Sequence, residues 1–227
     1  MHKRLLGLLG AGLMIVTACG GATTSSSPAA STPPAASGGA SEQPAGSPSA
    51  AADLADEQIL RVTLGSEDPD TLDASKASTS TSIGVLHALN RGLLYVDHDL
   101  TPVPSLAEAL PELSADGLTY TFKLRDAKYS NGDPIVAADL VYAWQRLVDP
   151  RTASQYQAII QDVAGAQALI DMTGKDPAPS AAEIDAALAK LGVAAPDDKT
   201  FTVTLAHPTG YFLDIVTLWN TAPMQKK

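Results

Sequence analysis

Cys19 is the only cysteine among 227 residues, and it stands directly after an apolar run that ends in Val16-Thr17-Ala18. A lone thiol has no partner for an internal disulfide, so burial of a core must hold the fold together. The position of this thiol favours covalent attachment of a lipid. The alternative is an ordinary buried free cysteine.

The segment before Cys19 has the parts of a secretory signal. His2-Lys3-Arg4 supplies a positive start, Leu5 to Val16 is apolar, and small residues lead to the cleavage point. The apolar stretch is shorter than the ~20 residues that span a membrane. The junction resembles the lipobox of bacterial lipoproteins, whose cysteine receives a diacylglyceryl group and becomes the first mature residue. We therefore expect a signal peptide over residues 1–18 and a lipid anchor at Cys19, which places the protein on the outer side of the cell membrane, facing the periplasm or the exterior.

The residues that follow Cys19 have a biased composition. Between Gly20 and Ala52, only Glu42 and Gln43 depart from Ala, Ser, Pro, Gly and Thr. Such a segment cannot bury enough apolar surface to offset its ordering entropy. The sequence predicts a disordered tether over residues 19–52, as opposed to a mere low-complexity insertion. Residues 53–227 are long enough for one domain with its own core.

Other side chains that could do chemistry form no recognisable catalytic or metal pattern. One loop is acidic and suggests calcium: Glu67, Asp68, Asp70 and Asp73. These residues lack the D-x-[DN]-x-[DN]-G pattern of an EF-hand loop. Three histidines stand singly, without a ligand partner at metal spacing: His87, His98 and His207. G-x-S-x-G and Walker A motifs are also missing. We predict a protein that is not an enzyme and that carries no metal or cofactor.

The charge of the chain excludes a further class of partner. The chain has 15 basic and 25 acidic residues, and the segment before Cys19 contains two of the basic ones and none of the acidic ones. Nucleic-acid binding depends on clustered Lys and Arg, which the rest of the sequence lacks. Nucleic acid is therefore not an expected partner.

Three stretches alternate apolar and polar residues, a period that predicts strands with one buried face. They are Leu60 to Leu64, Thr119 to Leu124 and Thr200 to Leu205. Ser130 to Pro134 is a turn by composition, because Asn and Gly tolerate a left-handed backbone.

Apolar stripes at helical spacing lie between and after these strands. They cover residues 83–93, 138–149, 156–170, 184–191 and 212–219. We expect Ser82 to cap the first helix, and Ser180-x-x-Glu183 is a capping box for the fourth. The second should pack through Leu140, Trp144 and Leu147. Interspersed helices and strands predict an α/β fold.

Two runs of sequence support a more specific identification. Residues 120–134 read YTFKLRDAKYSNGDP, and residues 139–150 read DLVYAWQRLVDP. They resemble the signature of the bacterial extracellular solute-binding proteins of family 5. Within that family, oligopeptide-binding proteins carry a W-Q-R-x-x-D-P-x-T-A-S-x-Y run similar to residues 144–156. The resemblance covers nearly all of Leu60 to Met224.

The resemblance implies the fold of a type II periplasmic-binding protein, a two-lobed Venus flytrap. It implies a monomer that captures oligopeptides and delivers them to the permease subunits of an ABC transporter. Members of the family are usually much longer than this chain. We therefore expect only the first-lobe portion here, without the second lobe that holds most contacts to the peptide termini.

The resemblance also implies a few ligand contacts within this portion. Tyr156 matches a tyrosine that touches bound peptide, although packing in a helix core explains Tyr156 equally well. Ser78 and Thr79 lie in a loop that runs along the peptide. Ala77 stands where enteric relatives have a glutamate, and Ala74 replaces the usual proline.

Three alternatives to peptide capture remain open at this stage. The first is a truncated lipoprotein that binds nothing. The second is a family member that binds another solute, such as nickel, haem or a sugar. The third and more remote one is a surface hydrolase without a recognisable nucleophile motif.

Overall fold

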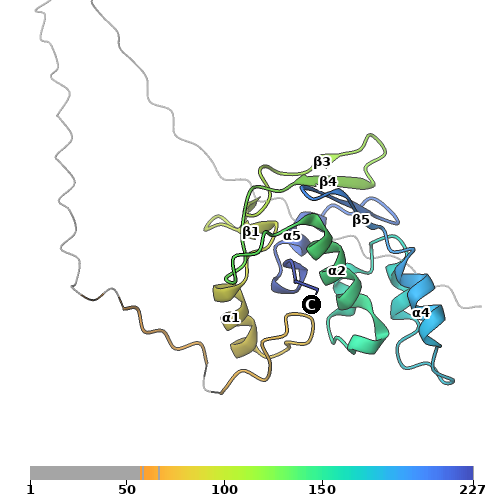
Figure 1. Cartoon of the computed structure of the whole chain (residues 1–227), viewed down its shortest axis with the longest axis horizontal. Coiled ribbons are helices and arrows are strands. Elements are labelled where there is room, and N and C mark those ends of the chain that lie inside the picture. Colours follow the sequence, from red (N-terminus) through yellow and green to blue (C-terminus); the bar gives the residue numbers. More distant parts are fainter. Residues whose placement is uncertain (1–56, 58, 66, 227) are drawn as a thin grey trace, which may run out of the picture. The chain divides into compact units, whose positions relative to one another are not determined.

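The computed structural model describes residue 57 and residues 59–65 and 67–226 (Figure 1). Cys19, the predicted signal peptide and the predicted tether lie outside the described residues. The described residues from Ile59 onward form one compact unit.

The main sheet has four antiparallel strands in the order β3 (Glu112–Leu113), β4 (Thr119–Lys123), β6 (Thr200–Thr204) and β5 (Val193–Asp197). The register of the two central strands pairs Tyr120 with Val203 and Phe122 with Phe201. Because alternate residues of a strand point to the same face, these side chains meet in one apolar layer and are buried. The strands expected over residues 119–124 and 200–205 are therefore confirmed.

The outer strands β3 and β5 were not predicted. β5 reads VAAPD and contains Pro196, which cannot donate to a ladder and is tolerated at a sheet edge. Its pairing with β6 shifts register between Ala194 and Asp197. Neither strand shows an alternating pattern: β3 has only two residues, and β5 lies at a sheet edge and carries Ala-Ala-Pro in place of alternating apolar and polar residues.

Helix α2 (Ala137–Val148) packs against β5 and β6, and in Figure 1 it lies between α1 (Ser80–Leu89) and α4 (Ala181–Leu188). Its expected stripe is confirmed, since Leu140, Trp144 and Leu147 are fully buried. The indole of Trp144 meets Phe201 edge-on at 5.5 Å between ring centroids. Its Nε1 donates a hydrogen bond to the carbonyl oxygen of Thr221 at 3.1 Å.

The stripe at residues 156–170 does not form a continuous helix. The chain after α2 makes two short 3₁₀ turns, η1 (Pro150–Thr152) and η2 (Gln157–Ile160), and then α3 (Ala166–Ile170). Gly165 has a φ of 81°, which interrupts a helix. The preceding residue, Ala164, donates its backbone N–H to the carbonyl oxygen of Thr204, so this segment is hydrogen-bonded to the sheet and does not continue a helix. The capping box that opens α4 is confirmed.

A smaller hairpin pairs β1 (Leu94–Val96) with β2 (Pro102–Pro104), and the last elements are α5 (Phe212–Val216) and η3 (Trp219–Thr221). Most of the core forms one cluster between the sheet, α2 and α5.

Within the described part of the chain, no helix is both long and apolar enough to span a bilayer.

The strand expected over Leu60 to Leu64 is wrong for this structure. These residues form no strand, and Leu60 and Val62 are 86% and 63% exposed. The alternating pattern is real, but a strand requires a hydrogen-bonding partner, and the described residues do not supply one.

Truncation of Trp144 should reveal how much of the fold depends on its burial. Trp144→Ala should lower the free energy of unfolding by about 3–5 kcal/mol, because it leaves a cavity between α2, Phe201 and Phe212. Chemical denaturation followed by circular dichroism measures the change. The control is Leu110→Ala at a side chain 51% exposed, which should change stability by less than about 0.5 kcal/mol. Equal effects of the two substitutions would contradict this packing.

Candidate functional site

An ion pair fixes the loop before α1 to helix α2. Arg146 donates from Nη1 and Nη2 to the two carboxylate oxygens of Asp73 at 2.6 and 2.5 Å. The side chains are 23% and 25% exposed. A bidentate arginine–carboxylate pair is directional as well as strong, so it sets the position of the loop. Burial raises the pKa of the Asp73 carboxyl, but the Arg146 and Ser75 hydrogen bonds and the Arg146 charge together hold that pKa below its usual value.

The start of α1 differs from the sequence prediction. Thr79, not Ser82, is the N-cap, and its Oγ1 accepts a hydrogen bond from the backbone N–H of Ser82 at 3.2 Å. The hydroxyl of Ser82 donates to Asp70 instead, as does that of Thr79. Thr79 can serve as the cap because its backbone is extended, whereas Ser82 already lies inside the helix.

These contacts separate the two loop residues named as candidate ligands. The hydroxyl of Thr79 is engaged in the cap, so its side chain acts first as scaffold. Ser78 is half-buried, and its side chain makes no hydrogen bond within the described residues. Ser78 therefore has the freer hydroxyl of the two.

Tyr156 packs in a small apolar cluster beside the same loop. The cluster is centred on the buried residues Ala74, Ala77, Leu86 and Trp219, and Tyr156 lies against it. The Tyr156 ring meets the Trp219 indole edge-on, at 5.1 Å between centroids and an interplanar angle of 84°. Because the Tyr156 side chain remains partly exposed, it both packs on the cluster and presents surface outside it. The structure thus places Tyr156 against the cluster that contains Ala77, the neighbour of Ser78.

Sequence reasoning missed two features around the Ser78 loop, the position of Trp219 and the Asp73–Arg146 ion pair. Trp219 was recognised only as the end of an apolar stripe, although it forms the floor under Tyr156. Arg146 belongs to the W-Q-R run, and Asp73 follows Leu72 in the matched loop, yet nothing in the spacing of 73 residues indicated their pairing. Trp219 Nε1 is buried and has no hydrogen-bond acceptor within the described residues.

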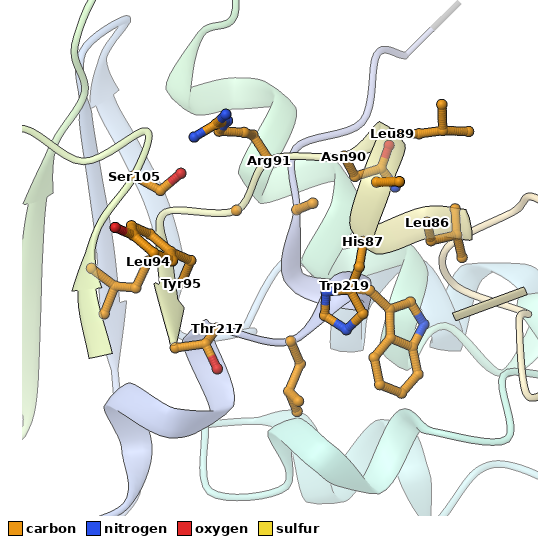
Figure 2. Close-up of a pocket in the computed structure, with 14 residues that line it drawn as sticks. Leu86, His87, Leu89, Asn90, Arg91, Leu94, Tyr95, Ser105, Thr217 and Trp219 are labelled. Carbon is orange, nitrogen blue, oxygen red and sulfur yellow. The ribbon is translucent and has the colours of Figure 1, made fainter. Parts of the chain in front are cut away.

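A pocket of ≈ 440 Å³ opens beside Trp219, between the end of α1, β1 and η3. Figure 2 shows Tyr95 and Ser105 on one side of it, with His87 and Trp219 on the other. Arg91 is its only cationic lining residue. The pocket shares Leu86 and Trp219 with the apolar cluster on which Tyr156 packs. We call the surface made by Ser78, Tyr156, Trp219 and this pocket the α1 face.

The acidic loop and the histidines hold no assembled metal site in the described part of the chain. The one group with ligand atoms close together is Asp97, His98 and Asp99, all within 4.8 Å, which differs from the expectation that His98 has no carboxylate partner. Asp97 accepts hydrogen bonds from the N–H groups of Asp99 and Thr101, so this group is explained as an exposed turn.

Comparison with known proteins gives a consistent result. The sequence model described as Bacterial extracellular solute-binding proteins, family 5 Middle, matches residues 101–227. The chain is 38% identical over 191 residues to the periplasmic oligopeptide-binding protein OppA of Escherichia coli, covering 80% of this chain and 32% of that protein. It is 40% identical over 146 residues to a dipeptide-binding protein of Lactococcus lactis, covering 64% and 24% of the two.

Solved structures agree. Listeria monocytogenes OppA bound to peptide superposes with a TM-score of 0.60 at 34% identity, over 67% of this chain and 28% of that one. The mixed α/β fold class is confirmed, and the structure covers a part of these periplasmic-binding proteins. The chain spans about a third or less of the length of the relatives it matches.

Because of the Asp73–Arg146 pair, we expect the free energy of unfolding to fall at acidic pH. Because the pKa of Asp73 is lowered in the folded protein, its contribution is fully present above the usual value of 3.8 and is lost as the pH falls through the folded pKa. Asp73→Asn should lower stability at neutral pH and make stability less dependent on pH below 3.8. Urea denaturation at several pH values measures both effects. The control is Asp68→Asn at an exposed loop position, and an unchanged acid profile in Asp73→Asn would contradict the role of the pair.

Proposed function

The chain belongs to the bacterial extracellular solute-binding proteins of family 5, and on that basis we propose that it captures oligopeptides for an ABC importer. The observation that carries the proposal is the match to peptide-binding relatives over most of the chain. The permease subunits of the importer are the partner in this proposal. Capture requires no covalent chemistry and no cofactor.

The geometry of the α1 face suggests how peptide would be held. Ser78 offers backbone groups beside the start of α1 and a hydroxyl that makes no hydrogen bond to the described residues, and Tyr156 offers a partly exposed aromatic ring. Peptide backbone groups are well satisfied by main-chain hydrogen bonds from an extended segment, as in strand addition. The Asp73–Arg146 pair would keep that segment in place, since it fixes the loop to α2.

Enclosure is the other requirement for tight binding. A site open to water exposes peptide groups to competition for each hydrogen bond, whereas pockets that bind small ligands well bury most of the ligand surface. The chain spans only about a third of its relatives' length. We therefore propose that the described part holds peptide weakly by itself, and that tight binding depends on enclosure by further protein surface.

Peptide binding to this face can be tested by NMR, which detects weak complexes. Titration with a pool of tripeptides and tetrapeptides should shift backbone signals of Ser78 and Thr79 and the ring signals of Tyr156, with an affinity near or weaker than millimolar, about 4 kcal/mol. Tyr156→Ala should reduce these shifts. Tyr156→Phe keeps the ring on Trp219 and serves as a control for packing.

Three outcomes would oppose this proposal. Shifts confined to other surfaces would place the ligand elsewhere. Complete absence of shifts at high peptide concentration would favour a lipoprotein that binds nothing. Micromolar affinity for the chain alone would show that enclosure is not needed.

We also propose that Cys19 carries a lipid and is the sole membrane anchor. Each buried CH₂ of an acyl chain contributes about 0.8 kcal/mol, so two or more chains hold a protein firmly at a bilayer. Cys19→Ala should move the protein from the detergent phase to the aqueous phase on phase separation, and Cys19→Ser should behave in the same way. If either variant partitions like the parent, a different anchor is responsible.

A further inference from the structure

A second concave surface lies apart from the α1 face, between α3, α4 and the segment that joins them. We call it the α3–α4 groove. Its volume is ≈ 520 Å³, and it is lined by Gly165, Ala168, Met172, Lys175, Pro177, Ala178, Pro179, Glu183, Ala186, Ala187 and Lys190. None of these residues belongs to the α1 face, and in Figure 1 α4 lies on the far side of α2 from α1. Peptide capture as proposed above does not use this groove.

Close packing of α3 and α4 accounts for the shape of the groove. A Cβ built on Gly165 would lie 2.6 Å from the carbonyl oxygen of Lys190, so only glycine permits the start of α3 to approach the end of α4 this closely. The facing residues Ala168 and Ala186 are small and leave space above the contact. Met172 and Ala187 pack against the main core beneath. The floor of the groove is thus apolar and rests on a rigid base.

The rim of the groove is cationic in a protein of net charge −10. Lys175 and Lys190 are both exposed, and neither makes an ion pair within the described residues. Glu183 is the only acidic lining residue, and its carboxylate already accepts hydrogen bonds from the N–H and the hydroxyl of Ser180 at 2.8 and 2.7 Å. The two lysine charges exceed the one carboxylate charge of Glu183, and neither ammonium group is paired with that carboxylate, so the lining has a net positive charge.

We propose that the α3–α4 groove binds an anionic amphiphile, with an unbranched apolar tail along the alanine, proline and methionine walls and a carboxylate head between Lys175 and Lys190. The combination of an apolar floor and a rim of net positive charge fits this class of ligand. Pockets of about 300–1,000 Å³ with mainly apolar linings and few polar groups are typical small-molecule sites. A neutral apolar ligand would leave the lysines unused, and a cationic one would be repelled.

Decanoate is a suitable probe, with decyltrimethylammonium as a probe of similar tail length and opposite charge. In titrations of the full chain followed by NMR, decanoate should shift the methyl signal of Met172 and the backbone signals of Ala186 and Ala187. Decyltrimethylammonium should bind at least tenfold more weakly. The variant Lys175→Glu/Lys190→Glu should raise the dissociation constant for decanoate about tenfold or more, because both attractions become repulsions.

A matched control separates local charge from net charge. Arg61→Glu/Lys128→Glu changes the net charge by the same amount at exposed positions outside the groove, and it should leave decanoate affinity within about twofold. Because all four side chains are exposed, these variants should keep the melting temperature of the parent, which checks folding independently.

Several results would overturn the proposal. One is equal affinity of the two probes, and another is unchanged decanoate binding in the Lys175→Glu/Lys190→Glu variant. Decanoate-induced shifts at Ser78 and Tyr156 in place of Met172 would assign the amphiphile to the α1 face. Groove signals that move with protein concentration alone would assign the surface to a second copy of the chain.

Discussion

The buried indole of Trp144 is the contact on which the rest of the structure depends. Its ring packs on Phe201 of β6 and on Phe212 of α5, while its Nε1 donates to the carbonyl of Thr221 in η3. One side chain therefore joins the central helix to the sheet and to the last two elements of the fold. Because Trp219 lies in the same short turn as Thr221, this contact also determines where the floor of the α1 face lies.

Much of this arrangement could be predicted from the sequence. Prediction succeeded where a segment and the segment that packs beside it both had a clear apolar pattern. The alternation at Tyr120 and Phe122 matches the alternation at Phe201 and Val203, and the two strands pair. The stripe through Leu140 and Trp144 faces that layer. The same pattern failed at Leu60 to Leu64, because alternation specifies a buried face but does not supply the strand that must lie beside it.

The site was harder to anticipate than the fold. The resemblance pointed to Tyr156, Ser78 and Thr79. The identity of a residue does not reveal whether its hydroxyl already makes hydrogen bonds within the protein. Thr79 proved to be the cap of α1, which sequence reasoning had assigned to Ser82. The Asp73–Arg146 pair joins residues 73 positions apart, and such a contact follows from how the loop docks on α2, not from any local signal.

The exposed segment from Ile59 to Leu64 affects how the protein interacts with other chains in the cell. Its apolar side chains face solvent, and no backbone hydrogen bond joins it to the other described residues. An unpaired extended segment of this kind is a template for pairing with other chains and is a recognition element for chaperones and proteases. The net charge of −10 opposes self-association but does not hide the segment. Any copy in which no strand covers these six residues therefore presents an aggregation and degradation signal that does not depend on the stability of the core around Trp144.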